Sequence, residues 1–419
     1  MEARRSYRPL AVVVTAALVY VLAVIQRMSP PVVALEIMND LAMTADHMSL
    51  MFAVTMLGYG LMQPVAGFWA DCFGPRKCLS CAALILGAAS LIFSLSPGLG
   101  PGLAARALVG LAAGVALMPC LKLASHWFSP ARFGLASSLI VSAAALANFA
   151  VGRPLASAAS AFGWRGSFFG LGVMGLGLAV LVFLIVRDHP PQETAPETEP
   201  GCRPRPAFFQ TARLIVGKLD FWRLALIYGA TDLAYGAFIG LWAGPWLMEV
   251  HHLSEVEVGN ILSVSAFGFL IGPPLLVILA QAWKSPSKVL AVVALANTLI
   301  ALVLVRGPET MSYTALCLFC FIAPVGGQVA PLLFVLTKSI VPDHLGASAM
   351  GLINIAPILA GGLMQKVVGG VLTRAGGSGL TSYELYGQAF QPMLICLILS
   401  IPLTLWQVRA EKKSRGKAD

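Results

Sequence analysis

The sequence predicts an all-α membrane protein with twelve transmembrane helices that form two pseudo-symmetric bundles of six. Three observations support this fold class. Of the 419 residues, 58% are hydrophobic and only 11% are charged, against roughly 25% charged residues in soluble domains. The mean hydropathy is +0.82. The apolar residues gather in segments long enough to cross a bilayer, which needs about 20 residues at 1.5 Å each.

Twelve apolar segments are predicted to span the membrane as helices. Backbone N–H and C=O groups find no water inside a bilayer, so they must bond within the segment that carries them. Glycine and proline at 97–101 and a turn at 163–165 separate the closest neighbours. The predicted helices are residues 10–35, 46–69, 79–98, 102–126, 134–160, 166–186, 222–248, 257–281, 289–306, 311–337, 346–373 and 387–408.

Basic residues concentrate in every second connection between these segments. Most of the 28 Lys and Arg residues lie in connections on the same side as the N-terminus, and the positive-inside rule places that side in the cytosol. We therefore expect a multi-pass protein of the cell inner membrane with both termini cytoplasmic. The net charge of +9 follows from this distribution and does not indicate nucleic-acid binding.

A polar connection divides the chain into two halves. It is rich in Pro and Glu and poor in apolar residues, a composition typical of a solvated linker. The halves resemble copies of each other, since at a shift of 212 residues Pro119 matches Pro331 and Gly114 matches Gly326. Parallel repeats of six helices are a transporter architecture. The predicted domains are an N-terminal six-helix bundle at 1–186, a cytosolic linker at 187–221, and a C-terminal six-helix bundle with a basic tail at 222–419.

The connection between the second and third helices reads GFWADCFGPRKCL. It has an acid at a helix end, a glycine–proline turn and two cations, in the spacing G-x-x-x-D-x-x-G-x-R-K. A turn with positive-inside charges would have a similar composition. The spacing resembles the cytoplasmic loop motif of the major facilitator superfamily (MFS), and the resemblance implies that the acid and the bases form a charge latch which helps hold the outward-facing state. The gating candidates are Gly67, Asp71, Gly74, Arg76 and Lys77.

Further stretches are similar to the same family. The fourth segment contains R-x-x-x-G-x-x-x-G beginning at Arg106, which we include in the gating motif, and the turn after it reads WFSPARFG. The sixth segment opens with GWRGSFF and ends in VRDHPP. The counterpart of the loop motif in the second half, QAWKSPSKVL, keeps Lys284 and Lys288 but lacks the acid. The resemblance implies the MFS fold and a permease of the bacterial type that works by alternating access.

Asp232 is the only acid predicted to lie deep within a helix. A charge at mid-membrane costs about 2.5–3.5 kcal/mol on insertion scales, so it requires an explanation. At α-helical spacing Asp232 shares one face with Tyr235, Ile239, Trp242 and Trp246, which suits a cavity that contacts a solute. Two alternatives stay open: the tryptophans belong to the interfacial aromatic belt, or the acid is a structural partner of a neighbouring helix.

Arg27 lies late in the first helix, just before Pro30 and Pro31, and Tyr20 is on the same face seven residues earlier. The first and seventh helices line the central cavity in the family that the sequence resembles. The resemblance therefore implies that Arg27 and Asp232 face the same water. A structural ion pair or an interfacial position is the alternative for Arg27.

Other polar residues in the predicted helices are weaker candidates. Lys122 is near enough to the cytosolic end for its ammonium to extend to the surface, and Lys366 lies nearer the outer face. Neutral mid-helix side chains could bind a solute or hydrogen-bond a neighbouring helix. The remaining candidates for the solute site are Asn148, Arg153, Gln328 and Asn354.

The charges predicted inside the membrane are mostly basic, which favours an anionic or zwitterionic solute because Arg binds carboxylate with a two-pronged geometry. The sequence has no phosphate-binding loop of the form G-x-x-x-x-G-K-[ST]. The expected function is therefore secondary active transport of a small organic solute, by symport or antiport. We hypothesise that Asp232 takes up and releases a proton, and a uniporter or an anion exchanger is the alternative.

The alternative function is a non-transporting membrane sensor or an intramembrane enzyme. An enzyme would need clustered acids, a metal-binding set or a nucleophile with its base, and the six histidines fall at helix ends or in loops. We therefore expect no enzyme activity, no cofactor, no metal and no disulfide framework. The expected partners are a small-molecule solute, protons and the lipid bilayer, without nucleic acid, and the expected state is a monomer.

Overall fold

The computed structural model describes residues 2–43, 45–151, 153–190, 208–308, 310–375 and 379–415. Within these residues twelve helical segments are long and apolar enough to cross a membrane, which confirms the predicted all-α membrane fold. The spans are Pro9–Met28, Leu50–Phe73, Pro75–Ser94, Leu99–Trp127, Pro130–Val151, Ser157–Ile185, Leu219–Val250, Val256–Ala282, Pro286–Arg306, Tyr313–Ser339, Gly346–Leu372 and Ser382–Lys413.

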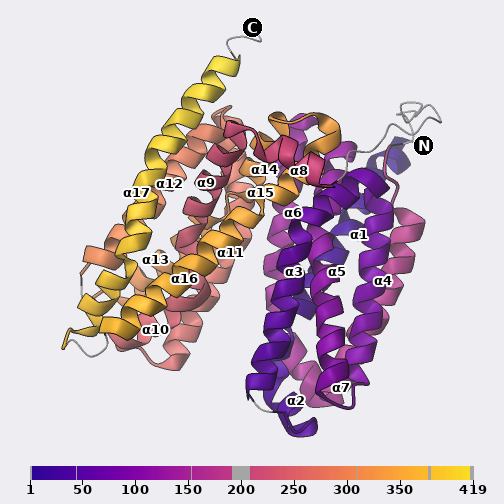
Figure 1. The fold of residues 1–419 in the computed structure, drawn as a ribbon, viewed down its shortest axis with the longest axis horizontal. Coiled ribbons are helices and arrows are strands. Elements are labelled where there is room, and N and C mark those ends of the chain that lie inside the picture. Colours follow the sequence, from indigo (N-terminus) through magenta and orange to yellow (C-terminus); the bar gives the residue numbers. More distant parts are fainter. Residues whose placement is uncertain are drawn as a thin grey trace. The chain divides into compact units, whose positions relative to one another are not determined.

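The chain forms two compact units (Figure 1). Unit 1 comprises Met1–Ile215 and Val341–Leu352, and unit 2 comprises Val216–Ile340 and Ile353–Asp419. Unit 1 contains α1 (Glu2–Met28), η1 (Pro30–Val33), α2 (Ala34–Asp40), α3 (Ala45–Phe73), α4 (Pro75–Ser94), α5 (Leu99–Trp127), α6 (Pro130–Val151), α7 (Arg153–Ile185), nearly all of α8 (Phe208–Val216), η3 (Asp343–Leu345) and nearly all of α15 (Gly346–Ile353). Unit 2 contains α9 (Leu219–Leu233), η2 (Ala234–Trp242), α10 (Ala243–Val250), α11 (Glu255–Ala282), α12 (Pro286–Arg306), α13 (Tyr313–Gly327), α14 (Ala330–Ser339), α16 (Ile355–Ala375) and α17 (Ser382–Arg415).

The helices of the two units pair in the same way. In unit 1, α3 packs on α5, α4 on α7 and α1 on α6. In unit 2, α11 packs on α13, α12 on α17 and α9 on α16. Each pair holds the same place in the order of its half-chain. The packing inside each unit therefore agrees with the pseudo-symmetry predicted from the repeated Gly and Pro positions.

The first span is shorter than the predicted helix at 10–35. α1 ends at Met28, and the chain continues into the 3₁₀ turn η1 and the short helix α2. Pro30 and Pro31 have no backbone N–H, so they cannot continue the α-helical bonding. The next amide, that of Val32, donates to the carbonyl of Ser29 at 3.1 Å.

The predicted linker at 187–221 contains a helix. Residues 191–207 of this linker lie outside the described residues, and α8 follows them. Thr211 and Ile215 are buried, whereas Phe209 and Leu214 are exposed. The linker therefore contains a short helix with one buried side, which the Pro- and Glu-rich composition before it does not indicate.

The seventh span is not a continuous α-helix. α9 passes into the π-helix η2, and α10 completes the span. A π-helix bonds each residue to the fifth along the chain and is frequently found at functional sites. Side-chain amides of neighbouring helices donate to carbonyls in and just before η2. Gln365 Nε2 donates to the Gly236 carbonyl at 2.7 Å, and Asn297 Nδ2 donates to the Thr231 carbonyl, near the end of α9, at 2.7 Å.

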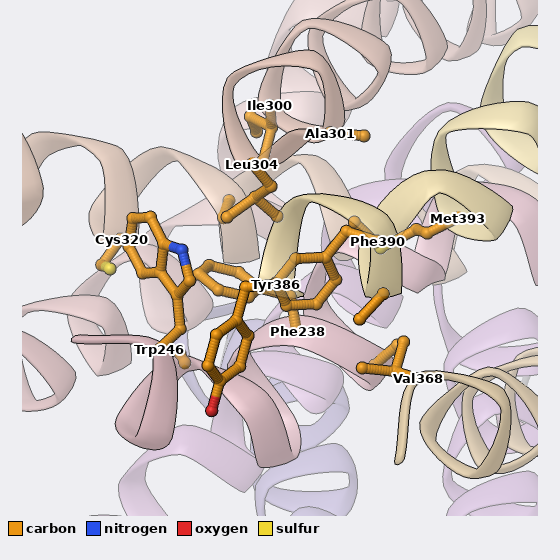
Figure 2. Packing of buried hydrophobic residues seen from close by; sticks show 14 of the residues in the cluster. Phe238, Trp246, Ile300, Ala301, Leu304, Cys320, Val368, Tyr386, Phe390 and Met393 are labelled. Atoms are coloured by element: carbon orange, nitrogen blue, oxygen red, sulfur yellow. The ribbon is translucent and has the colours of Figure 1, made fainter. Parts of the chain in front are cut away.

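The apolar core of unit 2 anchors η2 and α10 (Figure 2). The ring of Phe238 makes edge-to-face contacts with Trp246 and Phe390, with centroids 5.5 and 5.6 Å apart. Tyr386 joins Phe390 from the same helix, α17, and Leu304 packs beside them from α12. Such ring contacts contribute about 0.5–1.5 kcal/mol beyond the area that they bury. This core fixes the end of the irregular seventh span.

Replacement of Phe390 by Ala is expected to destabilise the protein by about 3–5 kcal/mol, because it removes a fully buried ring and leaves a cavity between α17 and η2. The measurement is the thermal unfolding midpoint of the purified protein in detergent. Phe162→Ala is the matched control, since the Phe162 side chain is 75% exposed, and it should leave the midpoint unchanged. Equal losses in the two variants would contradict this packing.

Candidate functional site

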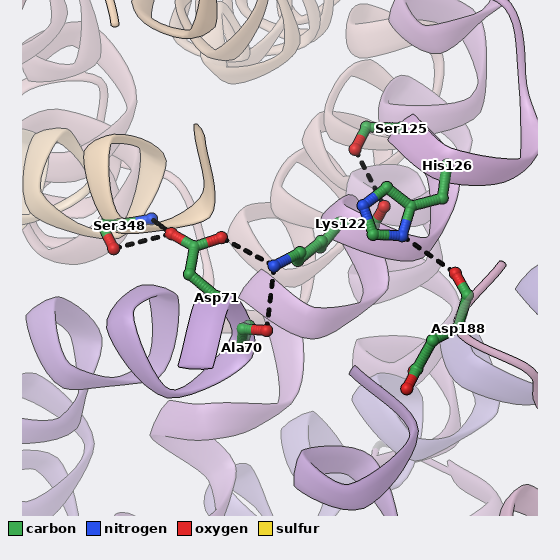
Figure 3. Close-up of polar contacts among 7 residues, drawn as sticks. All are labelled: Ala70, Asp71, Lys122, Ser125, His126, Asp188 and Ser348. Carbon is green, nitrogen blue, oxygen red and sulfur yellow. Dashed lines mark hydrogen bonds and ion pairs between the residues drawn. The ribbon is translucent and has the colours of Figure 1, made fainter. Parts of the chain in front are cut away.

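The acid of the loop motif forms a buried ion pair with a lysine of the fourth span (Figure 3). Asp71 lies near the end of α3, and its Oδ1 is 2.9 Å from Nζ of Lys122 on α5. The side chains of Asp71 and Lys122 are 6% and 13% exposed. Lys122 also donates to the carbonyl of Ala70 at 3.0 Å. Because α3 and α5 pack closely, Lys122 points into this contact and does not extend to the surface as its position in the sequence suggested.

The other carboxylate oxygen of Asp71 accepts two hydrogen bonds from Ser348, in the first turn of α15 (Figure 3). The backbone N–H of Ser348 donates at 2.8 Å and its hydroxyl at 2.7 Å. An acid is favourable there, because the first N–H groups of a helix lack intrahelical acceptors and the helix dipole is positive at that end. Gly67 permits this approach, since a Cβ atom there would overlap the carbonyl of Ala347.

Arg76 and Lys77, the expected basic partners of Asp71, have other surroundings. The Arg76 guanidinium donates to the carbonyl of Phe183 on α7, with Nε at 3.1 Å, and lies over the Phe183 ring at 4.5 Å from its centroid. Lys77 is exposed. The turn directs α4 onto α7 and away from the end of α3. Asp71 is therefore paired with Lys122 in place of the two cations of the motif.

The turn between α3 and α4 rests on Asp188, a residue that the sequence did not single out. Oδ1 of Asp188 accepts the backbone N–H of Arg76 at 2.7 Å. Gly74 has φ +84°, a region that favours glycine, and a Cβ atom there would lie 2.6 Å from Asp188 Oδ2. Nδ1 of His126 lies 2.8 Å from the Asp188 carbonyl oxygen (Figure 3). The start of the linker is thus bound to the loop motif and to the end of α5.

Unit 2 contains the same helix cap at the corresponding place. Glu411, near the end of α17, accepts the backbone N–H of Ser287 through Oε2 at 3.1 Å. Ser287 is the second residue of α12, directly after a proline, just as Arg76 is the second residue of α4. In each unit, an acid therefore caps the third helix of that half: Asp188, just after α7, in unit 1 and Glu411, near the end of α17, in unit 2.

Arg106 lies far from the loop motif, although its sequence pattern placed it in the gating set. At 1.5 Å per residue it is roughly 24 Å along α5 from Lys122. Its guanidinium is buried and donates to the carbonyls of Gln26 and Arg27 at 2.9 and 3.4 Å. Among the residues that the structure describes, no carboxylate pairs with it. Arg106 therefore contacts the end of α1 and not the loop motif.

Arg27 is half-buried at the end of the first span and has an aromatic partner. Its guanidinium lies over the ring of Tyr59 on α3, 3.9 Å from the centroid. Its Nε is buried without a hydrogen-bond partner, and no acid of the described residues forms an ion pair with it. Tyr20 is buried on the same helix. One face of Arg27 is thus covered by a ring, and no carboxylate of the described residues neutralises its charge.

Asp232 lies at the end of α9, directly before the π-helix. In the described part of the chain its carboxylate has neither an ion-pair nor a hydrogen-bond partner. Oδ2 sits against the backbone of Gly236, where a Cβ atom would be 2.7 Å away. Arg27 belongs to unit 1 and Asp232 to unit 2.

The face predicted for Asp232 and the aromatic residues after it does not continue through η2. The prediction used the spacing of an α-helix, and the π-helix changes that spacing. The Tyr235 ring packs against Phe269 at 5.0 Å between centroids, whereas Trp246 lies in the core of unit 2. Trp242 Nε1 donates to the Gln365 carbonyl at 3.3 Å. These aromatic residues therefore do not form one stripe with the acid.

The weaker solute-site candidates are divided between the two units. Asn354 is at the break between α15 and α16, and its Oδ1 accepts the hydroxyl of Tyr228 at 3.1 Å. Gln328 is buried at the break between α13 and α14. Asn148 is exposed on α6, and the side chain of Arg153, the first residue of α7, lies outside the described residues. Two of these candidates therefore mark helix breaks. The described residues contain no group of three or more metal-binding side chains.

Comparisons with known proteins agree on the family. Residues 16–364 match a family model described as Major Facilitator Superfamily. The chain is 28% identical over 173 residues to the probable sulfoacetate transporter SauU of Cupriavidus necator, a match that covers 41% of this chain and 40% of that relative. It is 23% identical over 380 residues to the hexuronate transporter of Escherichia coli, covering 86% of this chain and 87% of that protein. The chain thus matches less than half the length of SauU.

A solved structure shares the fold. The crystal structure of the E. coli fucose:proton symporter FucP has a TM-score of 0.68 at 12% identity, and the likeness covers 94% of this chain and 99% of that chain. At this level of identity the likeness concerns the arrangement of the helices.

Removal of one charge from the Asp71–Lys122 pair is expected to cost about 1–3 kcal/mol, because the other charge stays buried without its partner. We expect Asp71→Asn and Lys122→Met each to lower the thermal unfolding midpoint, and the double variant to lower it less than the sum of the two. Lys77→Met is the matched control, since Lys77 is exposed, and it should have no effect. Additive losses would show that the two side chains do not interact.

Proposed function

Since the chain belongs to the major facilitator superfamily, we propose that it is a secondary active transporter that moves a small organic anion across the cell inner membrane by alternating access. The observation that carries this proposal is the environment of Arg27. This cation lies in the first span with a ring on one face and no acidic partner among the described residues.

A guanidinium in this position suits a carboxylate or a sulfonate. An uncompensated charge inside a membrane costs several kcal/mol on insertion and simulation scales. An anion with two oxygens on one atom offsets this cost, because the planar guanidinium donates to both oxygens at once. The ring of Tyr59 holds the guanidinium from one side through its negative face. Arg27 is therefore the residue that we assign to the acid group of the solute.

The names of the relatives support an acidic solute. One relative is named a hexuronate transporter and another a probable sulfoacetate transporter. A hexuronate carries a carboxylate, and sulfoacetate carries a carboxylate and a sulfonate. Both kinds of acid group fit the two-pronged geometry of an arginine side chain.

We further propose that the transport is coupled to protons through Asp232. The sequence has no phosphate-binding loop, so a solute or ion gradient supplies the energy. Asp232 is the candidate because its carboxylate has no cationic partner among the described residues of unit 2. Without such a partner its charge depends on whether it binds a proton. The π-helix that follows supplies an irregular backbone of the kind found at functional sites.

The contacts of Asp71 with Lys122 and with the first turn of α15 are our candidate gate. We propose that these contacts form when the transport path is closed at this end and break when it opens. Arg76 and Lys77 lie at the same end of unit 1 as these contacts. By the positive-inside rule, their charges favour a cytosolic location for this end and for both termini. One chain provides both six-helix halves of this cycle, so we propose that the transporter acts as a monomer and not as an enzyme.

Arg27→Gln is expected to reduce uptake of an acidic solute by about 10- to 100-fold, because the charge-assisted hydrogen bonds to the acid group are lost. The measurement is uptake of glucuronate, sulfoacetate and fucose by the purified protein in liposomes, with fucose as the neutral solute. Arg27→Lys should retain part of the uptake, since it keeps the charge but not the two-pronged geometry. Arg306→Gln, at an exposed arginine, is the control. Uptake of fucose alone, or full acid uptake by Arg27→Gln, would refute an anion-binding Arg27.

Asp232→Asn is expected to abolish the dependence of uptake on a proton gradient and to spare exchange of solute across the membrane, because the amide cannot carry the proton. The measurement compares uptake driven by an imposed pH gradient with counterflow in the same liposomes. Asp343→Asn, which changes an exposed aspartate, should behave like the parent protein. If gradient-driven uptake survived Asp232→Asn at the parent rate, another group would carry the proton.

A further inference from the structure

Two consecutive prolines leave two carbonyl groups at the end of α1 without their helical partners. In an α-helix the N–H of each residue donates to the carbonyl four residues earlier. The positions four residues after Gln26 and Arg27 are Pro30 and Pro31, which have no N–H. An unsatisfied carbonyl is costly within a membrane, because no bulk water can replace the lost donor.

Arg106 donates to these same two carbonyls. Its Nη1 is 2.9 Å from the Gln26 carbonyl oxygen, and its Nη2 is 3.4 Å from that of Arg27. Arginine presents donors on two nitrogens in a fixed fork, a geometry that the single ammonium of lysine lacks. The Arg106 side chain is 1% exposed and its guanidinium lies 5.6 Å from the centroid of the Phe93 ring.

The charge of Arg106 is also favourable at this place. The carboxyl end of a helix carries a partial negative charge, so a cation is stabilised there. No carboxylate among the described residues competes for the guanidinium. The hydroxyl of Ser29 donates to the carbonyl of Ile25, so consecutive carbonyls at the end of α1 have side-chain donors.

We propose that Arg106 is a positioning residue that replaces the two amide donors missing at Pro30 and Pro31 and thereby fixes Arg27 for the solute. This inference rests on the proposed role of Arg27. One of the two carbonyls that Arg106 binds belongs to Arg27 itself. The side chain of Arg27 has no hydrogen bond to hold it among the described residues and contacts the ring of Tyr59, so its direction depends on the backbone that Arg106 holds.

The first test needs no solute. Arg106→Gln is expected to lower the thermal unfolding midpoint by about 2–4 °C, because one or both carbonyls lose their donor. Adding Pro30→Ala and Pro31→Ala to this variant supplies two backbone N–H groups and should restore much of the loss. Pro64→Ala, which changes a proline inside α3, is the matched control and should restore nothing. An absence of recovery with the two alanines, or equal recovery with Pro64→Ala, would overturn the replacement of amide donors.

The second test separates positioning from general stability. It measures KM and maximal rate in liposomes for the acid of the earlier panel, glucuronate or sulfoacetate, that the parent protein takes up. Arg106→Gln should raise KM by about 10-fold, and combining it with Arg27→Gln should raise KM no further than Arg27→Gln alone, because Arg106 acts through Arg27. Restoration of KM by Pro30→Ala with Pro31→Ala would support the same mechanism.

The outcomes distinguish this inference from the proposed function. Multiplied effects of the two arginine substitutions on KM would overturn positioning by Arg106 while keeping Arg27 as the anion-binding residue. An unchanged KM in Arg27→Gln, or no uptake of either acid, would refute the proposed function and with it the positioning role. The thermal unfolding midpoints of the Arg106→Gln variants would then still decide whether Arg106 replaces the N–H donors that Pro30 and Pro31 lack.

Discussion

The absence of water from the bilayer interior is the constraint on which the structure depends. Regular helices satisfy it by themselves, so each interruption of a helix needs donors from elsewhere. At the end of α1 the donor is Arg106. Around η2 the donors are Gln365 and Asn297. The two interruptions lie beside Arg27 and Asp232, the two charges to which we assign solute and proton. Irregular backbone and candidate function therefore coincide in both units.

Some charged side chains within the spans have partners in the protein and others do not, and we assign structural and transport roles on this difference. Asp71 and Lys122 neutralise each other, and Arg106 is held by carbonyl groups at a helix end. These charges have partners within the protein, although Nε of Arg106 is buried without a hydrogen-bond partner. Arg27 and Asp232 lack a counter-charge among the described residues. A charge without an internal partner responds to what binds it, which is the property that a transporter requires of a solute site and a proton site.

The sequence was sufficient to predict the number of spans, because span length and hydropathy follow directly from the thickness of the bilayer. The predicted end of the first helix is too late, because Val32, Val33 and Ala34 continue the apolar run. Hydropathy contains no information on the N–H groups that Pro30 and Pro31 lack. The loop motif indicated Asp71 by spacing. Its partner Lys122 depends on the register of α3 against α5, which is a tertiary property.

The π-helix was not predictable from the pattern around Asp232. An α-helix and a π-helix differ by one residue in the bonding step, and the apolar, Gly-rich stretch from Tyr228 to Trp246 accommodates either. Contacts from other helices accompany the π form, namely the amide of Gln365 and the aromatic core at Phe238. The predicted stripe of aromatic residues is wrong for this reason. Whether Asp232 has a charged partner depends on which side chains of other helices lie near it, and the sequence does not give these contacts.

The two halves share one polar device and differ in another, and the comparison assigns a role to each. An acid caps the third helix in both halves: Asp188, just after α7, in unit 1 and Glu411, on α17, in unit 2. A feature present in both copies serves the bundle that they have in common. The latch of Asp71 has no second-half counterpart, since QAWKSPSKVL lacks the acid. The ion pair of Asp71 and its contact with α15 are therefore additional to the cap that the two bundles share. This asymmetry favours a gating role for Asp71 over a purely structural one.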